Sequence, residues 1–252
     1  MADHDDHWLA AELATSAGEL LLALRADLSD EGVSSAEMKD AGDKASHDHI
    51  MASLAERRPH DAVLSEEGKD DAARLGADRV WIVDPLDGTR EFGEVPRTDW
   101  AVHIALVEDG VPTAGAVALP GRRLTLSTAE PAVLPAAHGG PPRVICSRTR
   151  PGPAAETVVA ALGGELVTMG SAGAKTMAVL LGEADIYPHT GGQYEWDSCA
   201  PVAVARAAGL HASRLDGSAL RYNQADVYLP DLLVCRPELL EATLAALAAA
   251  DG

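Results

Sequence analysis

The chain has 252 residues, 47% of them hydrophobic, and is long enough to bury a core in one large domain or two small ones. Its 39 acidic and 20 basic side chains give a formal net charge of −19, with no basic patch to offset phosphates. This composition argues against binding to nucleic acids or membrane surfaces and suits a protein that binds cations.

The three cysteines, Cys146, Cys199 and Cys235, stand far apart and form no CxxC pair. This favours buried free thiols in a reducing compartment over disulfides or a zinc site. The first seven residues are acidic, unlike a signal peptide, and no apolar run reaches membrane-spanning length. We therefore expect a cytoplasmic protein.

The first half of the chain predicts two helices followed by a sheet. Leucines recur at helical spacing over 8–28, and a second helix is expected from near Asp43 to the residue before Pro59. Strands are expected at 62–64 and 79–83, in a hairpin of 100–107 with 114–119, and at 122–127.

The second half predicts alternating strands and helices. Prolines and glycines between 130 and 143 indicate a boundary between an N-terminal α+β domain, 1–130, and a C-terminal α/β domain, 143–252. The expected strands are 143–147, 165–168, 184–187 and 231–235, and the expected helices are 153–162, 173–182, 199–208 and 237–249. The fold class is therefore α/β.

The most informative motif is DPLDGT at 84–89, directly after an apolar run. Pro85 restricts the turn between Asp84 and Asp87, and Gly88 lets the backbone approach a ligand closely. Two carboxylates beside backbone amides suit Mg²⁺ and a phosphate together. The alternative is an ordinary solvated turn, since Asp, Pro and Gly are common turn residues.

Three further acidic positions stand at a strand end or a helix start: Asp43, the Glu66-Glu67 pair and Asp197. A phosphatase that uses Mg²⁺ needs several carboxylates converging from separate elements. The sequence alone does not establish that convergence. Asp43 and Asp197 could instead serve only as helix caps.

Three blocks together resemble the inositol monophosphatase superfamily of lithium-sensitive, Mg²⁺-dependent phosphatases. They are LSEEG at 64–68, WIVDPLDGTREF at 81–92 and YEWDSCAPVAVARAAG at 194–209. The REF after DGT is similar to the bisphosphate nucleotidase branch of the CysQ type, whose members have DGTKEF there. The resemblance covers nearly the whole chain and implies a layered αβαβα sandwich, often assembled as a dimer.

The resemblance also implies metal ligands. Glu66, Asp84 and the carbonyl of Leu86 would hold one Mg²⁺, and Asp84, Asp87 and Asp197 would hold a second. A weaker third ion would lie near Glu66. Lithium sensitivity would follow if Li⁺ replaced one weakly held Mg²⁺.

For catalysis the resemblance implies Asp43, Thr89 and Glu66. Thr89, hydrogen-bonded to Asp43, would orient and deprotonate the attacking water, and the amides of Gly88 and Thr89 would hold phosphate oxygens. The family usually has a Thr-x-x-Asp pattern after the carboxylate at position 43. This chain departs from that pattern, so Asp48 stays open as the alternative partner of Thr89.

Further substrate contacts are expected from the CSR, SAGAK and RYN sequences, which also resemble the nucleotidase branch. They are Arg90, Ser147, Arg148, Ser171, Lys175 and Tyr222. Lys175 could bind phosphate near a helix start, and Tyr222 could stack on adenine. A plain surface position is the alternative for these lysine, arginine and tyrosine side chains.

The function implied is removal of the 3′-phosphate from 3′-phosphoadenosine 5′-phosphate, and from its sulfated relative, in sulfate assimilation. The nearest alternative is an inositol monophosphatase or fructose-1,6-bisphosphatase activity with the same metals, which the REF sequence disfavours. A second alternative is a non-catalytic protein that senses nucleotide or metal. The expected ligand is thus a small phosphorylated nucleotide.

Overall fold

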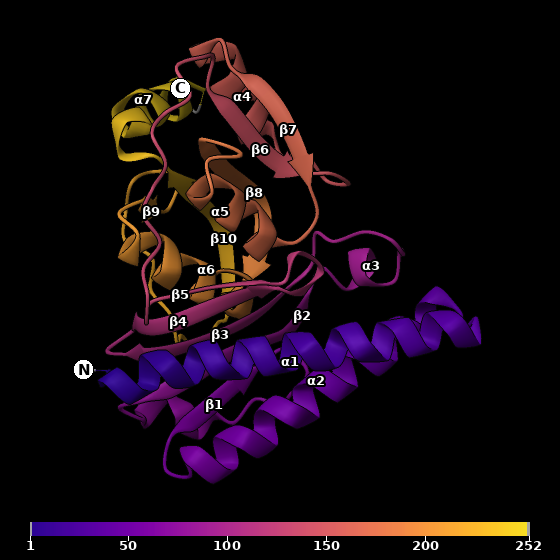
Figure 1. Cartoon of the computed structure of the whole chain (residues 1–252). Coiled ribbons are helices and arrows are strands. Elements are labelled where there is room, and N and C mark those ends of the chain that lie inside the picture. Colours follow the sequence, from indigo (N-terminus) through magenta and orange to yellow (C-terminus); the bar gives the residue numbers. More distant parts are fainter. Residues whose placement is uncertain (1, 251–252) are drawn as a thin grey trace.

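The computed structural model describes residues 2–250 (Figure 1). It begins with two long helices, α1 (His4–Glu31) and α2 (Ser35–Arg57). Each starts with a capping box, formed by Asp3 and Asp6 in α1 and by Ser34 and Glu37 in α2. Because Ser34 caps α2, this helix starts well before Asp43, where the sequence analysis expected it to start. Asp43 therefore lies inside a helix and is not a cap.

The first sheet has the strand order β1-β2-β3-β4-β5, with β1 and β2 parallel and the other neighbours antiparallel. The strands are β1 (Ala62–Ser65), β2 (Val80–Asp87), β3 (Ala101–Glu108), β4 (Val111–Leu119) and β5 (Leu124–Ser127). The 3₁₀ helices η1 (Ala72–Gly76) and η2 (Pro120–Arg122) and the short α3 (Thr89–Phe92) connect them. The predicted strands and hairpin are confirmed, and β2 extends further, to Asp87.

The second sheet has the order β7-β6-β8-β10-β9. Its strands are β6 (Arg143–Ser147), β7 (Glu165–Met169), β8 (Ile186–Tyr194), β9 (His211–Ser213) and β10 (Tyr228–Cys235). The helices are α4 (Pro153–Leu162), α5 (Ala172–Leu180), α6 (Glu195–Ala207), η3 (Pro237–Leu239) and α7 (Leu240–Ala250). The sequence analysis missed the three-residue β9 and started α6 four residues late, at position 199 rather than 195. The earlier start places Asp197 in the first turn of α6.

Alternate side chains of the strands enter different cores, as the pleat of a strand requires. On β2, Trp81 and Val83 join the core with α1 and α2, whereas Val80 and Ile82 join a central core with α5 and α6. On β6 and β8, Val144 and Ile186 instead face a third core with α4 and α7. The order is therefore helices, sheet, helices, sheet, helices (Figure 1). This five-layer αβαβα sandwich confirms the expected fold.

Residues 128–142 connect the two sheets without a helix or strand, as the proline and glycine pattern predicted. The central core nevertheless contains residues from both halves of the chain, such as Ile82 and Met177. The division into domains 1–130 and 143–252 stays a prediction. Among residues 2–250, no helix is both long enough and apolar enough to span a membrane.

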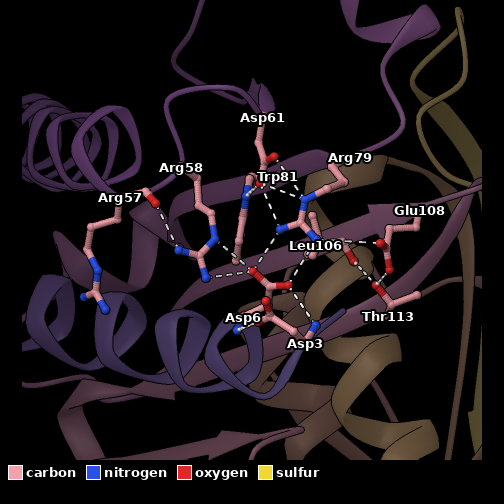
Figure 2. A network of polar contacts seen from close by, with 10 residues as sticks. All are labelled: Asp3, Asp6, Arg57, Arg58, Asp61, Arg79, Trp81, Leu106, Glu108 and Thr113. Carbon is pink, nitrogen blue, oxygen red and sulfur yellow. Dashed lines mark hydrogen bonds and ion pairs between the residues drawn. The ribbon is translucent and has the colours of Figure 1, made fainter. Parts of the chain in front are cut away.

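A polar network fastens the start of α1 to the edge of the first sheet (Figure 2). The Asp6 carboxylate is fully buried and accepts hydrogen bonds from Arg58 at 2.9 Å and from Arg79 at 2.8 and 3.1 Å. Arg79 also donates to Asp61, which accepts a further hydrogen bond from the Trp81 indole at 2.8 Å. These contacts join α1 to α2 and β2. Helix α2 carries Asp43, and strand β2 carries Asp84.

Candidate functional site: a carboxylate cluster beside a cavity

Three aspartates converge where β2 ends and α6 begins. One oxygen each of Asp84, Asp87 and Asp197 lies within 4.8 Å of the others. The β2–β3 pairing is irregular between Asp84 and Asp87, and the amide of Leu86 donates to Asp84 Oδ1 at 3.1 Å. This turn carries both carboxylates of the DPLDGT motif to the cluster, so the motif is not merely a solvated turn. Three convergent carboxylates form a group that can hold a divalent metal ion.

The position of Asp197 is compatible with both roles that the sequence analysis considered. Its Oδ2 accepts a hydrogen bond from the amide of Tyr194 at 2.6 Å, as a capping residue does. It is also a member of the acidic cluster. Because a carboxylate has two oxygens with several lone pairs, capping and metal binding are compatible.

Asp87 is held rigidly by the start of α5. Its carboxylate accepts hydrogen bonds from the amides of Ala172 and Gly173 at 3.1 and 2.7 Å and from the hydroxyl of Ser171. Nε2 of His103 lies 3.2 Å away. Burial alone would raise the pKa of Asp87, but His103 and these hydrogen bonds outweigh it and lower the pKa to about 2. Asp87 is therefore charged at neutral pH.

The neighbouring carboxyls are shifted in the opposite direction. Burial and the negative charges of Glu66 and Asp87 raise the pKa of Asp84 well above its ordinary value. Desolvation and the nearby Asp197 raise the pKa of Glu66 to about 7, and burial with Asp87 raises that of Asp197 to about 6. Without a counter-ion, these groups resist simultaneous ionisation. A bound divalent cation would remove that conflict.

Thr89 starts α3 directly after Gly88, whose φ of +84° favours glycine. Its Oγ1 lies 3.4 Å from Asp43 Oδ1 and 3.0 Å from the carbonyl oxygen of Leu86. Asp48 instead forms an ion pair with Lys44 on the exposed side of α2. Of the two carboxylates that the sequence left open, Asp43 is thus the one near Thr89. Burial and the charge of Glu67 raise the pKa of Asp43 to about 7.

A cavity of about 740 Å³ opens beside the cluster. It is large enough for a small organic ligand. Most of the predicted site residues line it: Glu66, Asp87, Gly88, Thr89, Arg90, Ser147, Ser171, Lys175 and Asp197. Asp84 is buried beneath this wall, at 1% exposure. Acidic and basic side chains therefore share one cavity.

Lys175 is not the surface lysine of the alternative interpretation. Its side chain is 5% exposed, and Nζ donates to the carbonyl oxygens of Ser171 at 2.6 Å and Gly170 at 3.3 Å. Burial lowers its pKa. The negative charges of Asp87 and Glu91 partly offset this lowering of the Lys175 pKa.

Two predicted substrate contacts are not brought to the cavity. Tyr222 is fully buried, and its hydroxyl lies 3.1 Å from that of Ser198, so its ring cannot stack on a ligand. Arg148 lies outside the cavity lining and donates to Glu91 at 2.8 Å and Glu94 at 3.0 Å. Burial therefore contradicts the predicted stacking of Tyr222 on a ligand, whereas the predicted substrate contact of Arg148 stays a prediction.

The sequence analysis missed several residues at the site, among them Arg150 and His103. Arg150 lines the cavity, whereas the sequence analysis chose Arg148, two positions earlier. His103, on β3, is fully buried, and its Nε2 lies 3.2 Å from Asp87. His103 could be recognised as a site residue only from the pairing of β3 with β2, which places it opposite Asp84. The local sequence does not determine that register.

Comparison with known sequences agrees with this geometry. The sequence model of the Inositol monophosphatase family matches residues 6–135 and 145–251. The chain is 49% identical over 260 residues to a 3′-phosphoadenosine 5′-phosphate phosphatase of Mycobacterium leprae (strain TN), covering 95% of each chain. It is 33% identical over 201 residues to the 3′(2′),5′-bisphosphate nucleotidase CysQ of Escherichia coli (strain K12), covering 75% of this chain and 81% of that protein.

Solved structures share the architecture. CysQ of Bacteroides thetaiotaomicron, a bacterial member of the inositol monophosphatase family, superposes with a TM-score of 0.82 at 31% identity. The match covers 92% of this chain and 97% of that chain. Inositol monophosphatase II of Staphylococcus aureus MSSA476 has the same fold, with a TM-score of 0.80 at 22% identity over 96% of this chain and 95% of that one. The family match, the relatives and the carboxylate cluster agree: the chain belongs to the inositol monophosphatase family.

Proposed function

We propose that this protein is a Mg²⁺-dependent phosphatase that removes the 3′-phosphate of 3′-phosphoadenosine 5′-phosphate. The relatives from Mycobacterium leprae and Escherichia coli, named for that activity and for bisphosphate nucleotidase activity, support the substrate. The observation that carries the proposal is one cavity lined both by Asp87 and Asp197 and by Arg90 and Arg150. Such a cavity suits a ligand with two phosphates, one at the metal ions and one at the arginines.

The donor set fits Mg²⁺, which prefers carboxylate, carbonyl and water oxygens. Asp84, Asp87 and Asp197 would hold one ion, and Glu66 with Asp84 and the carbonyl of Leu86 a second. When bound, these ions would neutralise charge on the phosphate and make water a better nucleophile. The raised pKa values of Asp84, Glu66 and Asp197 support cation binding, because each carboxyl gains a compensating positive charge.

Thr89 and Asp43 would together accept the proton that the attacking water loses. Hydrolysis consumes one water, forms a P–O bond to its oxygen and breaks the ester bond to the ribose 3′-oxygen, which takes up a proton from solvent and leaves as a hydroxyl group. The water proton would pass to Thr89 Oγ1 while the hydroxyl proton of Thr89 passes to Asp43. A carboxyl with a pKa of about 7 is suited to accept a proton near neutral pH.

Other chain groups would position the phosphate. Gly88 and Thr89 line the cavity, and a side chain at position 88 would lie 3.1 Å from Cβ of Ser171 and 3.2 Å from the carbonyl oxygen of Asp99. Glycine at position 88 thus keeps the turn close to Ser171 and leaves the amides of the turn near the ligand.

Three free, buried cysteines support a reducing, cytoplasmic location.

The test is phosphate release with Mg²⁺ from three substrates at equal concentration: 3′-phosphoadenosine 5′-phosphate, inositol 1-phosphate and fructose 1,6-bisphosphate. Each is measured with and without Li⁺. We expect a strong preference for the nucleotide and inhibition by Li⁺. Preference for either sugar phosphate would keep the metal mechanism and overturn the substrate. No release from any of them would favour a protein that senses nucleotide or metal.

A further inference from the structure

Arg25 is a buried arginine that the proposed reaction does not use. It lies in the C-terminal part of α1 and is 8% exposed. Within residues 2–250 its hydrogen-bond acceptors are three backbone carbonyl oxygens, and no carboxylate forms an ion pair with it. A buried charge is costly to leave without a counter-charge, so the fold must gain something else from this position.

The guanidinium of Arg25 binds the short helix α3 and the segment that follows it. Its Nε donates to the carbonyl oxygen of Phe92 at 2.7 Å, and its Nη2 donates to that of Glu91 at 3.1 Å. These are the last two residues of α3, which lies beside the C-terminal half of α1 (Figure 1). Its Nη1 donates to the carbonyl oxygen of Arg97 at 2.7 Å. One planar set of donors thus holds both ends of the segment 92–97.

Two aromatic rings lie against the same guanidinium. Cζ of Arg25 is 5.4 Å from the ring centroid of Phe92 and 5.6 Å from that of Trp100. The two rings pack edge to face, with their centroids 5.0 Å apart. Attraction between the cation and the ring faces partly replaces the missing counter-charge. Arg25 and Trp100 together therefore fix the position of the Phe92 ring.

The Phe92 ring in turn packs against α2. A Cβ at position 42 would lie 2.6 Å from Cε1 of Phe92 and 3.0 Å from Cδ2 of Leu86, so glycine is needed for this close approach. Gly42 directly precedes Asp43, and the carbonyl oxygen of Leu86 accepts the hydroxyl hydrogen bond of Thr89. One ring thus connects Arg25 with the backbone on both sides of the contact between Thr89 and Asp43.

Helix α3 depends on such support because it is a single turn. It is closed by hydrogen bonds from the amide of Phe92 to the carbonyl of Gly88 at 2.9 Å and from the amide of Gly93 to the carbonyl of Thr89 at 3.1 Å. A helix of this length is not stable by itself, and the last carbonyl groups of a helix lack partners within it. The bonds from Arg25 to these carbonyls therefore set the orientation of the first residue of α3, Thr89.

We propose that Arg25 is a positioning residue for the proposed reaction, which holds α3 so that Thr89 stays within reach of Asp43. This inference rests on the proposed function, because Thr89 is the group that receives the water proton in that reaction. Arg25 itself does not line the cavity. A small misplacement of a catalytic group can lower the rate about 100-fold without weakening substrate binding.

The first experiment measures phosphate release by Arg25→Met and Arg25→Lys. Methionine keeps a flexible side chain against the two rings but removes every donor, whereas lysine keeps the charge without the planar set of donors. Arg236→Met is the matched control, because Arg236 is also buried, at 6% exposure, and donates to the carbonyl oxygen of Pro135 at 3.1 Å, outside the cavity lining.

We expect kcat to fall about 100-fold in Arg25→Met and less in Arg25→Lys. KM and the rise of Tm with Mg²⁺ should stay near the wild-type values, because Arg25 contacts neither the cavity nor the aspartate cluster. Unchanged kcat in both Arg25 variants would overturn the inference. An equal loss in Arg236→Met would overturn it too, because any lost buried arginine would then have the same effect.

A double-mutant cycle decides whether Arg25 acts through Thr89. If it does, Arg25→Met should lower kcat of the wild type about 100-fold but that of Thr89→Ala by no more than about 2-fold. The assay uses enough protein to measure the residual activity of Thr89→Ala. Equal factors in both backgrounds would show that Arg25 acts independently of Thr89 and would overturn the inference.

Hydrogen exchange separates this inference from the proposed reaction, since it needs no turnover. Amides of 88–99 should exchange about 10-fold faster in Arg25→Met than in the wild type and Arg236→Met, while those of β6 should be unchanged. If the wild-type protein releases no phosphate, the proposed function fails, and this exchange decides whether Arg25 fixes α3 and Thr89. Equal exchange at 88–99 in all three proteins would overturn the inference.

Discussion

Oγ1 of Thr89 lies 3.4 Å from Oδ1 of Asp43, although 46 positions separate the two residues in the chain. Thr89 starts the short α3 at the end of β2, whereas Asp43 lies in the middle of α2. Helix α2 packs on β2 and α3 and brings the carboxylate to the hydroxyl. The contact therefore depends on the layer of helices that covers the first sheet.

Asp43→Asn should lower kcat by about 10²- to 10⁴-fold, because the amide cannot take up the proton that Thr89 passes on. KM should change little, since Asp43 does not line the cavity. The matched control is Asp48→Asn, five residues along the same helix, where the exposed carboxylate pairs with Lys44. Steady-state phosphate release checks both. Equal activity of the two variants would contradict the role of Asp43.

Asp84→Asn should abolish turnover while leaving the fold intact. The substitution is nearly isosteric and removes a carboxyl that is costly to ionise in the metal-free cluster, because burial and the charges of Glu66 and Asp87 raise its pKa. We therefore expect the metal-free variant to be at least as stable as the wild type, and Mg²⁺ to stabilise it less. Phosphate release and thermal unfolding with and without Mg²⁺ measure these effects. Near-normal turnover would refute the metal site.

The metal-free protein should lose stability as the pH rises from about 4 to 7. The pKa values of Asp43 and Glu66 are about 7 in the folded protein, above their ordinary values of 3.8 and 4.5. The folded state therefore binds more protons than the unfolded chain in this window, and raising the pH favours unfolding. Mg²⁺ should raise Tm more at pH 8 than at pH 5. In Asp43→Asn the loss of stability between pH 4 and 7 should be smaller. An unchanged loss of stability would contradict the assignment of this pH dependence to Asp43.

Gly173→Ala should disturb the site although alanine favours helices. A Cβ at position 173 would lie 2.0 Å from Nε2 of His103, which contacts Asp87. Neither the buried imidazole nor the helix start can move aside without shifting that aspartate. We expect reduced activity and weaker Mg²⁺ stabilisation. Gly76→Ala is the control, because nothing lies within 4 Å of its added Cβ. If both variants behaved alike, the close approach at position 173 would be unimportant.

Asp6→Asn should destabilise the fold by about 3 kcal/mol, since it leaves Arg58 and Arg79 without their shared buried counter-charge. Burial by itself would raise the pKa of Asp6, but the hydrogen bonds from Arg79, Asp3 and Arg58 lower it to about 2. The stabilisation of the fold by the ionised Asp6 carboxylate is therefore fully present above pH 4 and is lost as the pH falls toward 2.

Urea unfolding at pH 7 and at pH 3 measures the effect of Asp6→Asn. Arg57→Gln is the control, because the pair of Arg57 with Glu12 is exposed and should contribute less than about 1 kcal/mol. The difference between Asp6→Asn and the wild type should shrink at pH 3. A difference that stayed constant with pH would indicate lost packing rather than a lost charge.

The sequence by itself determined the secondary structure and most of the acidic site. Continuous apolar runs specified strands such as β2 and β3, because these strands are buried on both faces by different cores. The DPLDGT motif specified Asp84, Asp87 and Thr89, because Pro85 and Gly88 fix their turn locally. The start of α2 was missed, although Ser34 and Glu37 form a capping box that the sequence contains.

Only the tertiary structure decided which distant side chains meet. It selected Asp43 over Asp48, brought His103 to Asp87 through the pairing of β2 and β3, and buried Tyr222 beside Ser198. Local patterns show which face of a helix or strand is apolar, but they do not set the register or crossing of elements far apart in the chain. Those are set by the packing of the whole sandwich, and with them the composition of the cavity.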